Sequence, residues 1–175
     1  MDIYFNEQID DWDFNHIVYT DEVGPDPSVS ARFGIIDDEG QRIQIDVLAS
    51  AGLPCFKDAR CVDQIAYFGF GHCIFIFDTK TRELVRHQVD GYFGHMYDGS
   101  DFEHFPVQLS VIVTSASEAL AFSRQGKLLR VWSNLGIDGV TLNAVNESQI
   151  EGEGECDPPG GWRKFALTLD HGEFA

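Results

Sequence analysis

Three glutamates alternate with two glycines in the string EGEGECDPPGGW, which begins at Glu151. Residues two apart in a β-strand share a face, so Glu151, Glu153 and Glu155 are expected to line one side, about 7 Å apart. The glycines leave the opposite face bare, where another backbone or an aromatic ring can approach closely. Carboxylates on one face, joined by Asp157, have the chemistry to hold Ca²⁺ or to meet a cationic partner.

The spacing of these acids matches neither an EF-hand loop nor another recurring calcium motif. An acidic strand that faces solvent, and whose charge discourages edge pairing, is therefore the favoured interpretation. The Pro-Pro-Gly-Gly turn ends the strand, because proline cannot continue the hydrogen-bond ladder and glycine permits the reversal. We expect Trp132 and Trp162 to be the aromatic neighbours of the bare face.

A second group of titratable side chains lies in the string HMYDGSDFEHF, from His95 to Phe105. This string is predicted to be a long loop, and long loops inside compact β-domains are often functional. His95, Asp101 and His104 have the side chains of a divalent transition-metal site, although their spacing fixes no ligand triad. Aromatic anchors beside carboxylates are also what a protein interface needs at its hot spots. The candidate partner-binding residues are Tyr92, Tyr97, Asp98, Asp101, Phe102, Glu103, Glu151, Glu153, Glu155 and Asp157.

Motifs for nucleophilic or nucleotide-dependent catalysis are absent from the sequence. It contains no G-x-S-x-G elbow, no P-loop and no G-x-G-x-x-G, and GFGHC at 69–73 is predicted to be a hairpin turn. Cys156 lies beside carboxylates, which disfavour a reactive thiolate. The four cysteines form no C-x-x-C pair, so no zinc site is expected. We therefore predict no catalytic residues, no bound metal and no cofactor.

Short strands are the elements that must position these residues. Runs rich in β-branched and aromatic residues recur from the middle of the chain onward, separated by the polar connections TKTR, RQG, NES and DPPGG. Such strands with tight turns predict an antiparallel meander. The only helical signal is a single short turn within 54–66. The predicted strands cover 65–70, 73–78, 83–89, 109–115, 118–123, 127–133, 140–146, 149–155 and 163–170.

The strand pattern repeats about every 45 residues. The segment that starts at Phe75 aligns with the one that starts at Leu120, and weaker copies start at Leu167 and Gly34. Successive turn positions are 41, 45 and 47 residues apart, in the range of four-stranded propeller blades. These turn positions are Asp37, Asp78, Ser123 and Asp170.

The sequence predicts a single all-β domain over residues 1–175. Propeller-like repeats are the leading arrangement, and a β-sandwich is the alternative. Leu109 to Asn146 contains four predicted strands, as one blade would. The last unit stops after two strands, so the segment 1–5 or 14–20 is expected to complete it.

Charge narrows the expected partners. The chain has 29 Asp and Glu against 12 Lys and Arg, a formal net charge of −17. Such a field repels nucleic acid and anionic membranes and speeds encounter with basic proteins. The N-terminal segment resembles no signal peptide, and no apolar run reaches the ~20 residues of a membrane span, so a cytoplasmic location is expected.

Two strings carry a resemblance to a known group: SNLGIDGV at 133–140 and GEGECDPPGGW at 152–162. They are similar to strings in uncharacterised bacterial cytosolic proteins that carry NLGIDG and GEGEWDPPGGW, and the resemblance covers roughly residues 65–170. Cys156 stands where that group has Trp. The group implies no activity and no catalytic residues. Some small acidic bacterial proteins of this kind are similar to immunity proteins, which neutralise basic toxins.

We therefore expect a non-enzymatic acidic domain with an immunity-like role, which binds a basic protein through the 95–105 loop and the 151–157 strand. The alternative is a divalent-metal-binding protein or metal-dependent hydrolase that uses His95, Asp101 and His104. The sequence leaves the oligomeric state open.

Overall fold

A computed structural model describes residues 1–5, 12–20, 28–49, 56–157 and 159–169. Within these ranges the chain forms fifteen β-strands in four small sheets and no helix, which confirms the all-β prediction. No helix in the described part is therefore long and apolar enough to cross a membrane.

The strands of the first two sheets come from the N-terminal half of the chain. The first sheet contains, in spatial order, β1 (Asp2–Phe5), β3 (Ser28–Ile36), β4 (Arg42–Ala49) and β2 (Phe14–Tyr19). The second contains β5 (Lys57–Val62), β6 (Ile65–Phe70), β7 (Cys73–Asp78) and β8 (Leu84–Gln88).

The other two sheets are also built from strands that follow one another in the chain. The third contains β9 (Phe93–Tyr97), β10 (Leu109–Ser115), β11 (Ala119–Ser123) and β12 (Leu128–Trp132). The fourth contains β13 (Val140–Val145), β14 (Gln149–Glu155) and β15 (Trp162–Thr168).

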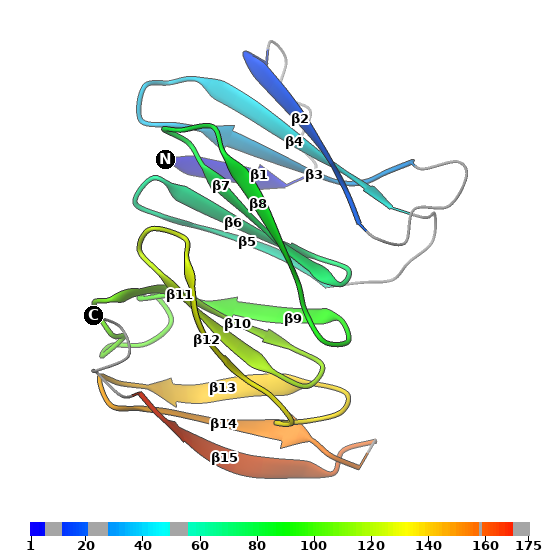
Figure 1. Cartoon of the computed structure of the whole chain (residues 1–175), viewed down its shortest axis with the longest axis vertical. Coiled ribbons are helices and arrows are strands. Elements are labelled where there is room, and N and C mark those ends of the chain that lie inside the picture. Colours follow the sequence, from blue (N-terminus) through cyan, green and yellow to red (C-terminus); the bar gives the residue numbers. More distant parts are fainter. Residues whose placement is uncertain (6–11, 21–27, 50–55, 158, 170–175) are drawn as a thin grey trace.

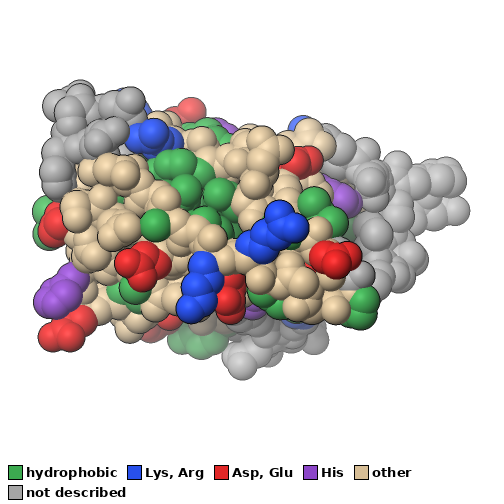
Figure 2. Space-filling model, turned by 90° about the horizontal axis from the view of Figure 1, so that it is seen from below, with side chains coloured by type: hydrophobic (Ala, Val, Ile, Leu, Met, Phe, Trp, Pro, Cys, Tyr) green, Lys and Arg blue, Asp and Glu red, His purple; other side chains and the backbone are tan. Residues whose placement is uncertain are grey.

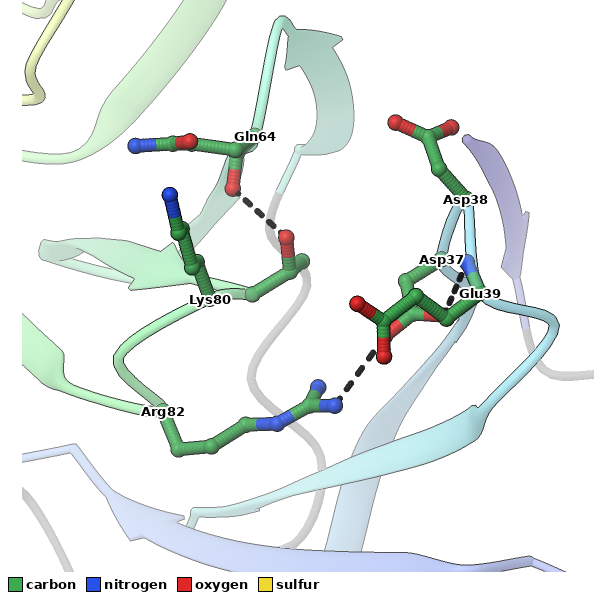
Figure 3. Close-up of a pocket in the computed structure, with 7 residues that line it drawn as sticks. Asp37, Asp38, Glu39, Gln64, Lys80 and Arg82 are labelled. Carbon is green, nitrogen blue, oxygen red and sulfur yellow. Dashed lines mark hydrogen bonds and ion pairs between the residues drawn. The ribbon is translucent and has the colours of Figure 1, made fainter.

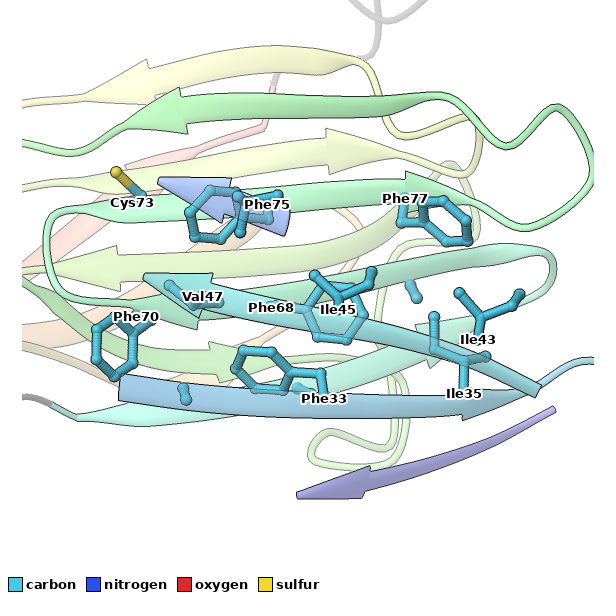
Figure 4. Close-up of a cluster of buried hydrophobic side chains, with 14 of the residues drawn as sticks. Phe33, Ile35, Ile43, Ile45, Val47, Phe68, Phe70, Cys73, Phe75 and Phe77 are labelled. Carbon is cyan, nitrogen blue, oxygen red and sulfur yellow. The ribbon is translucent and has the colours of Figure 1, made fainter. Parts of the chain in front are cut away.

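The four sheets lie one upon another in chain order along the long axis of the molecule (Figure 1). The first and fourth sheets lie at opposite ends of this stack, so the described sheets do not close into a ring. Three clusters of buried apolar side chains fill the spaces between successive sheets. Figure 4 shows the first of them, where Phe33 and Ile45 of the first sheet meet Phe68 and Phe75 of the second.

The position of a sheet in the stack explains the hydrophobic pattern of its strands. Along β6 alternate residues face opposite neighbours: Phe68 joins the cluster with the first sheet, and Tyr67 joins the cluster with the third. Because both faces are covered, IAYFGF is buried throughout. The end strand β14 is covered on one side only, and its residues alternate between buried and more exposed. Side chains alternate between the two faces in both strands. The face of β14 that no sheet covers carries polar residues, whereas β6 has no such open face.

Side-chain oxygens close the predicted turns. Asp37 Oδ1 accepts the backbone N–H of Glu39 at 3.0 Å, and Asp78 Oδ1 accepts that of Lys80 at 2.8 Å. Ser123 Oγ accepts the N–H of Gln125 at 3.2 Å in the same way. Short polar side chains at these positions therefore replace a missing backbone partner and reverse the chain. The fourth predicted turn position, Asp170, lies outside the described residues.

Four details of the predicted strand order are wrong. Phe93–Tyr97 is a strand that pairs with β10 and not part of a loop, so Leu109 to Asn146 spans strands of two sheets. The segments 1–5 and 14–20 do not complete the last unit, because β1 pairs with β3 and β2 with β4. The first sheet is also no simple meander: β1 occupies the free edge of β3, so β2 joins the sheet at β4, in parallel. The described part of 54–66 forms β5, a tight turn at 63–64 and the start of β6, with β5 paired to β6.

Alkaline pH is expected to destabilise the fold through Tyr67. Its hydroxyl hydrogen-bonds Ser110 Oγ at 2.6 Å and donates to the Ser123 carbonyl at 3.2 Å. Burial is the main cause that raises the pKa of Tyr67 to about 12, against an unfolded value of about 10. This contribution to stability is complete below the unfolded pKa and is lost as the pH rises through the folded pKa.

Urea unfolding across this pH window measures the effect, and Tyr67→Phe removes the titrating group. We expect the free energy of unfolding of the variant to fall less steeply with pH than that of the parent protein. Equal slopes would exclude Tyr67 as the source.

Candidate functional site

The alternation predicted for the glutamate strand is present in β14. Gly152 and Gly154 are buried on the face toward the third sheet, whereas Glu151 is exposed and Glu153 and Glu155 are half-buried on the other face. Glu153 is opposite Lys164 of β15 in the register of the sheet. Figure 2, the view of the molecule from below Figure 1, accordingly shows Lys and Arg side chains among the Asp and Glu.

The bare face of β14 packs against a loop backbone and a phenylalanine ring. A Cβ placed on Gly154 would lie 1.8 Å from the carbonyl oxygen of Leu135, and one on Gly152 would lie 2.5 Å from the ring of Phe165. The expectation of close approach is therefore correct. The nearest atoms belong to Leu135 at Gly154 and to the Thr141 carbonyl, at 2.3 Å, and then Phe165 at Gly152. Neither Trp132 nor Trp162 is among them.

Hydrogen bonds hold the loop at 134–139 between the third and fourth sheets. Ile137 N–H donates to the Glu155 carbonyl at 2.8 Å, and Glu155 N–H donates to the Gly139 carbonyl at 2.9 Å. On the other side, Gly139 N–H donates to the Ala116 carbonyl at 2.9 Å. The two strings that carry the sequence resemblance thus pack against each other, and their contact places Asp138 beside the end of β14.

Tyr92, a predicted site residue, lies at this contact. Its hydroxyl donates to the backbone carbonyl of Asp138 and lies 3.0 Å from the Asp138 carboxylate. Burial first, and then the hydrogen bond to Asp138 and the negative charges of Asp138 and Glu155, raise the pKa of Tyr92 to about 12. The phenol therefore stays protonated near neutral pH and remains a donor to Asp138.

Glu155 and Trp162 complete the same corner. Glu155 accepts a hydrogen bond from the Gly160 N–H, which ties its carboxylate to the turn after β14. Trp162 is paired with Glu155 across the sheet, and its ring lies against Gly139, where an added Cβ would be 3.4 Å away. The Pro-Pro-Gly-Gly turn therefore delivers Trp162 to the loop at 134–139.

A cavity of about 180 Å³, which we call the aromatic pocket, opens between these elements. The ring of Phe56 lies 6.2 Å from that of Tyr92 and 5.9 Å from that of His95, measured between centroids. Phe56 is 57% exposed and Trp162 is 42% exposed, which is unusual for large apolar side chains. The described lining is Phe56, Tyr92, Gly94, His95, Asp138, Gly139, Val140, Thr141 and Trp162.

Asp138 and Phe56 are pocket residues that the sequence does not single out, for different reasons. Asp138 lies inside the NLGIDG string, so the resemblance marks its segment but not the residue. Phe56 precedes β5 and carries no spacing signal. Only the packing of the second sheet on the third brings it to Tyr92.

The other predicted residues of the 95–105 segment lie at the far end of β9. Tyr97 and Phe102 turn inward, with ring centroids 5.6 Å apart, and join the cluster between the third and fourth sheets. Asp98 forms an ion pair with Arg60 at 3.6 Å, and its N–H donates to Asp101 Oδ2 at 2.9 Å. Glu103 is exposed.

The structure therefore divides the predicted surface. Tyr92 comes before β9 and Asp98 after it, so the two lie at opposite ends of a five-residue strand, on the order of 17 Å. Tyr92 meets the segment that contains Glu155, whereas the acids of the loop do not share that corner.

The metal-binding alternative finds no site in the described part of the chain. Within it, no three His, Cys, Asp or Glu side chains are placed to hold a metal ion. His95 lies in β9 with its ring against Phe56, and His104 is exposed on the loop beyond that strand. His95 therefore lies within β9, whereas Asp101 and His104, with which it was grouped, lie on the loop that follows this strand.

A second cavity, of about 200 Å³, lies between the turns of the first and second sheets (Figure 3). Arg82 reaches across it to Asp37 Oδ2 at 3.0 Å. Burial opposes ionisation of Asp37, but hydrogen bonds from Gln41, Arg82 and Glu39 outweigh it and lower its pKa. The ion pair links two sheets, and we assign this cavity a structural role.

Comparison with protein-family models, curated proteins and solved structures gave no match.

Gly154→Ala is expected to destabilise the fourth sheet, because the new methyl group would overlap the Leu135 carbonyl, a backbone atom that cannot rotate away. Overpacking of this kind lowers the free energy of unfolding by about 1–3 kcal/mol or more. Urea unfolding followed by tryptophan fluorescence measures it. Gly99→Ala is the matched control: its Cβ would make one ordinary contact at 4.0 Å, so a change within about 0.5 kcal/mol is expected. Equal losses would contradict the close approach.

Proposed function

We propose that this chain is a non-enzymatic binding protein that captures a basic protein partner through the corner formed by Tyr92, Asp138, Glu155 and Trp162 and the adjoining acidic face of β14. An immunity-like role in the bacterial cytoplasm, with a basic toxin as the partner, follows from the resemblance of the 133–140 and 152–162 strings.

One observation carries the proposal. Tyr92 and Glu155, two of the candidate partner-binding residues, are both held at the loop at 134–139: the Tyr92 hydroxyl lies 3.0 Å from the Asp138 carboxylate, and the Glu155 N–H donates to the Gly139 carbonyl at 2.9 Å. Packing therefore gathers residues that are far apart in the chain into one place where rings and carboxylates are adjacent. Aromatic anchors with a charged rim are typical of interface hot spots.

Charge supports a basic partner. The net charge of −17 steers cationic proteins toward the molecule over its whole surface. On β14, Lys164 opposite Glu153 offsets part of the local charge, whereas the turn that follows Glu155 adds Asp157, which is exposed. Exposed or half-buried carboxylates therefore continue from β14 into the turn that lies beside the aromatic pocket.

We also infer that the four sheets are propeller-like units of about 45 residues. The aligned segments that begin at Phe75, Leu120 and Leu167 correspond to the third strands of three successive sheets, β7, β11 and β15. This correspondence supports a repeated unit that stacks with its neighbours through apolar faces.

Capture of basic proteins from the native host tests the proposal. We expect the immobilised protein to retain basic proteins at low salt and to release them as the ionic strength rises. The double variant Glu151→Gln with Asp157→Asn should weaken capture roughly threefold to tenfold, because removed rim charges slow association.

The matched control is Glu39→Gln with Glu83→Gln, which removes the same net charge from exposed turns of the first and second sheets. It should weaken capture much less. Capture that is indifferent to salt, or equally weakened by both double variants, would overturn the proposal. Retention of nucleic acid in place of protein would do so as well.

A further inference from the structure

The aromatic pocket combines two features that favour a positive guest. Tyr92, Phe56 and Trp162 present rings to one cavity, and the face of an aromatic ring carries partial negative charge that attracts a cation within about 6 Å. The Asp138 carboxylate lies on the same lining. Among the described lining residues none is Lys or Arg, so no protein cation occupies this role.

Exposure of the rings makes the pocket available. Phe56 and Trp162 are about half exposed, although both line the cavity. A guest that covers them removes apolar surface from water, which adds about 25 cal/mol for each Å² buried. An alkyl chain that ends in a cation satisfies both parts of the site.

The size of the cavity limits the guest. At about 180 Å³ it is smaller than the roughly 300–1,000 Å³ of pockets that enclose drug-sized ligands. It therefore suits one side chain and not a whole cofactor or nucleotide.

We propose that the aromatic pocket takes the alkylammonium head of one lysine side chain of the basic partner. The identity of the guest as part of a protein rests on the proposed function, whereas the preference for an alkylammonium rests on the pocket alone. Lysine fits better than arginine, because Asp138 Oδ1 already lies 3.0 Å from the Tyr92 hydroxyl. A guanidinium fork uses both carboxylate oxygens and would compete with the Tyr92 hydroxyl for Oδ1, whereas a compact ammonium needs only one acceptor.

Binding of small probes tests this inference without any partner. The probes are Nα-acetyl-lysine methylamide, the arginine equivalent, and the norleucine equivalent, which keeps the alkyl chain without the charge. Two-dimensional NMR of the full chain follows the Trp162 indole N–H during titration. We expect a dissociation constant in the millimolar range for the lysine probe, and binding at least about fivefold weaker for each of the other two.

Asp138→Asn should weaken the lysine probe at least about fivefold while it keeps an oxygen that accepts from Tyr92. The matched control is Asp63→Asn, which removes one carboxylate from the turn between β5 and β6, outside the pocket, and should leave the affinity unchanged. Trp162→Leu should also weaken binding, with the dispersion of the NMR spectrum as the check that the variant is folded.

Each result bears on a separate claim. Equal binding of the norleucine probe, or no shift of the Trp162 signal with any probe, overturns the pocket inference. The proposed capture of basic proteins is tested separately, by its salt dependence. Tighter binding of the arginine probe overturns the assignment to lysine. Selective lysine binding without capture of a basic protein would overturn the proposed function and keep the pocket.

Discussion

The close approach of the Leu135 carbonyl to Gly154 is the contact on which the proposed binding corner depends. No side chain larger than glycine fits at that point of β14, because even a methyl group would overlap a backbone atom. With glycine there, the loop at 134–139 lies flat on the strand and exchanges hydrogen bonds with Glu155 on one side and with Ala116 on the other. The third and fourth sheets are thereby joined through backbone as well as through their apolar cluster.

The position of Asp138 follows from that contact, and the chemistry of the corner follows from Asp138. The Tyr92 hydroxyl donates to its backbone carbonyl and lies 3.0 Å from its carboxylate, and its neighbour Gly139 lies against the Trp162 ring. A cavity forms where the rings from three sheets meet around one carboxylate. The glutamates of β14 lie on the opposite face of the strand, and the glycines between them determine how closely the loop at 134–139 approaches.

Much of the architecture could be predicted from local sequence. Strand period and turn chemistry predict most strands after residue 64, and the short polar side chains at Asp37, Asp78 and Ser123 close turns as expected. The strand Phe93–Tyr97 is not predicted by local sequence, because Gly94 interrupts it and its apolar residues do not alternate regularly. The pairing of β2 with β4 depends on which strand edges remain free, and no local pattern records that.

The candidate site was only half predictable. The sequence pattern predicts Tyr92 and Glu155 as separate site residues and predicts a close approach at the glycines of β14. It groups Tyr92, however, with acids that lie beyond the other end of β9. Phe56 joins the pocket only through the stacking of the second sheet on the third. Such contacts arise from packing between sheets, which strand periodicity does not encode.

A crystal structure of the chain with a bound lysine-containing peptide tests the central claim most directly. The account predicts one lysine ammonium within hydrogen-bond distance of the Asp138 carboxylate, with its alkyl chain between the Tyr92 and Trp162 rings. A peptide bound instead along the loop that follows β9, with the aromatic pocket empty, would contradict it.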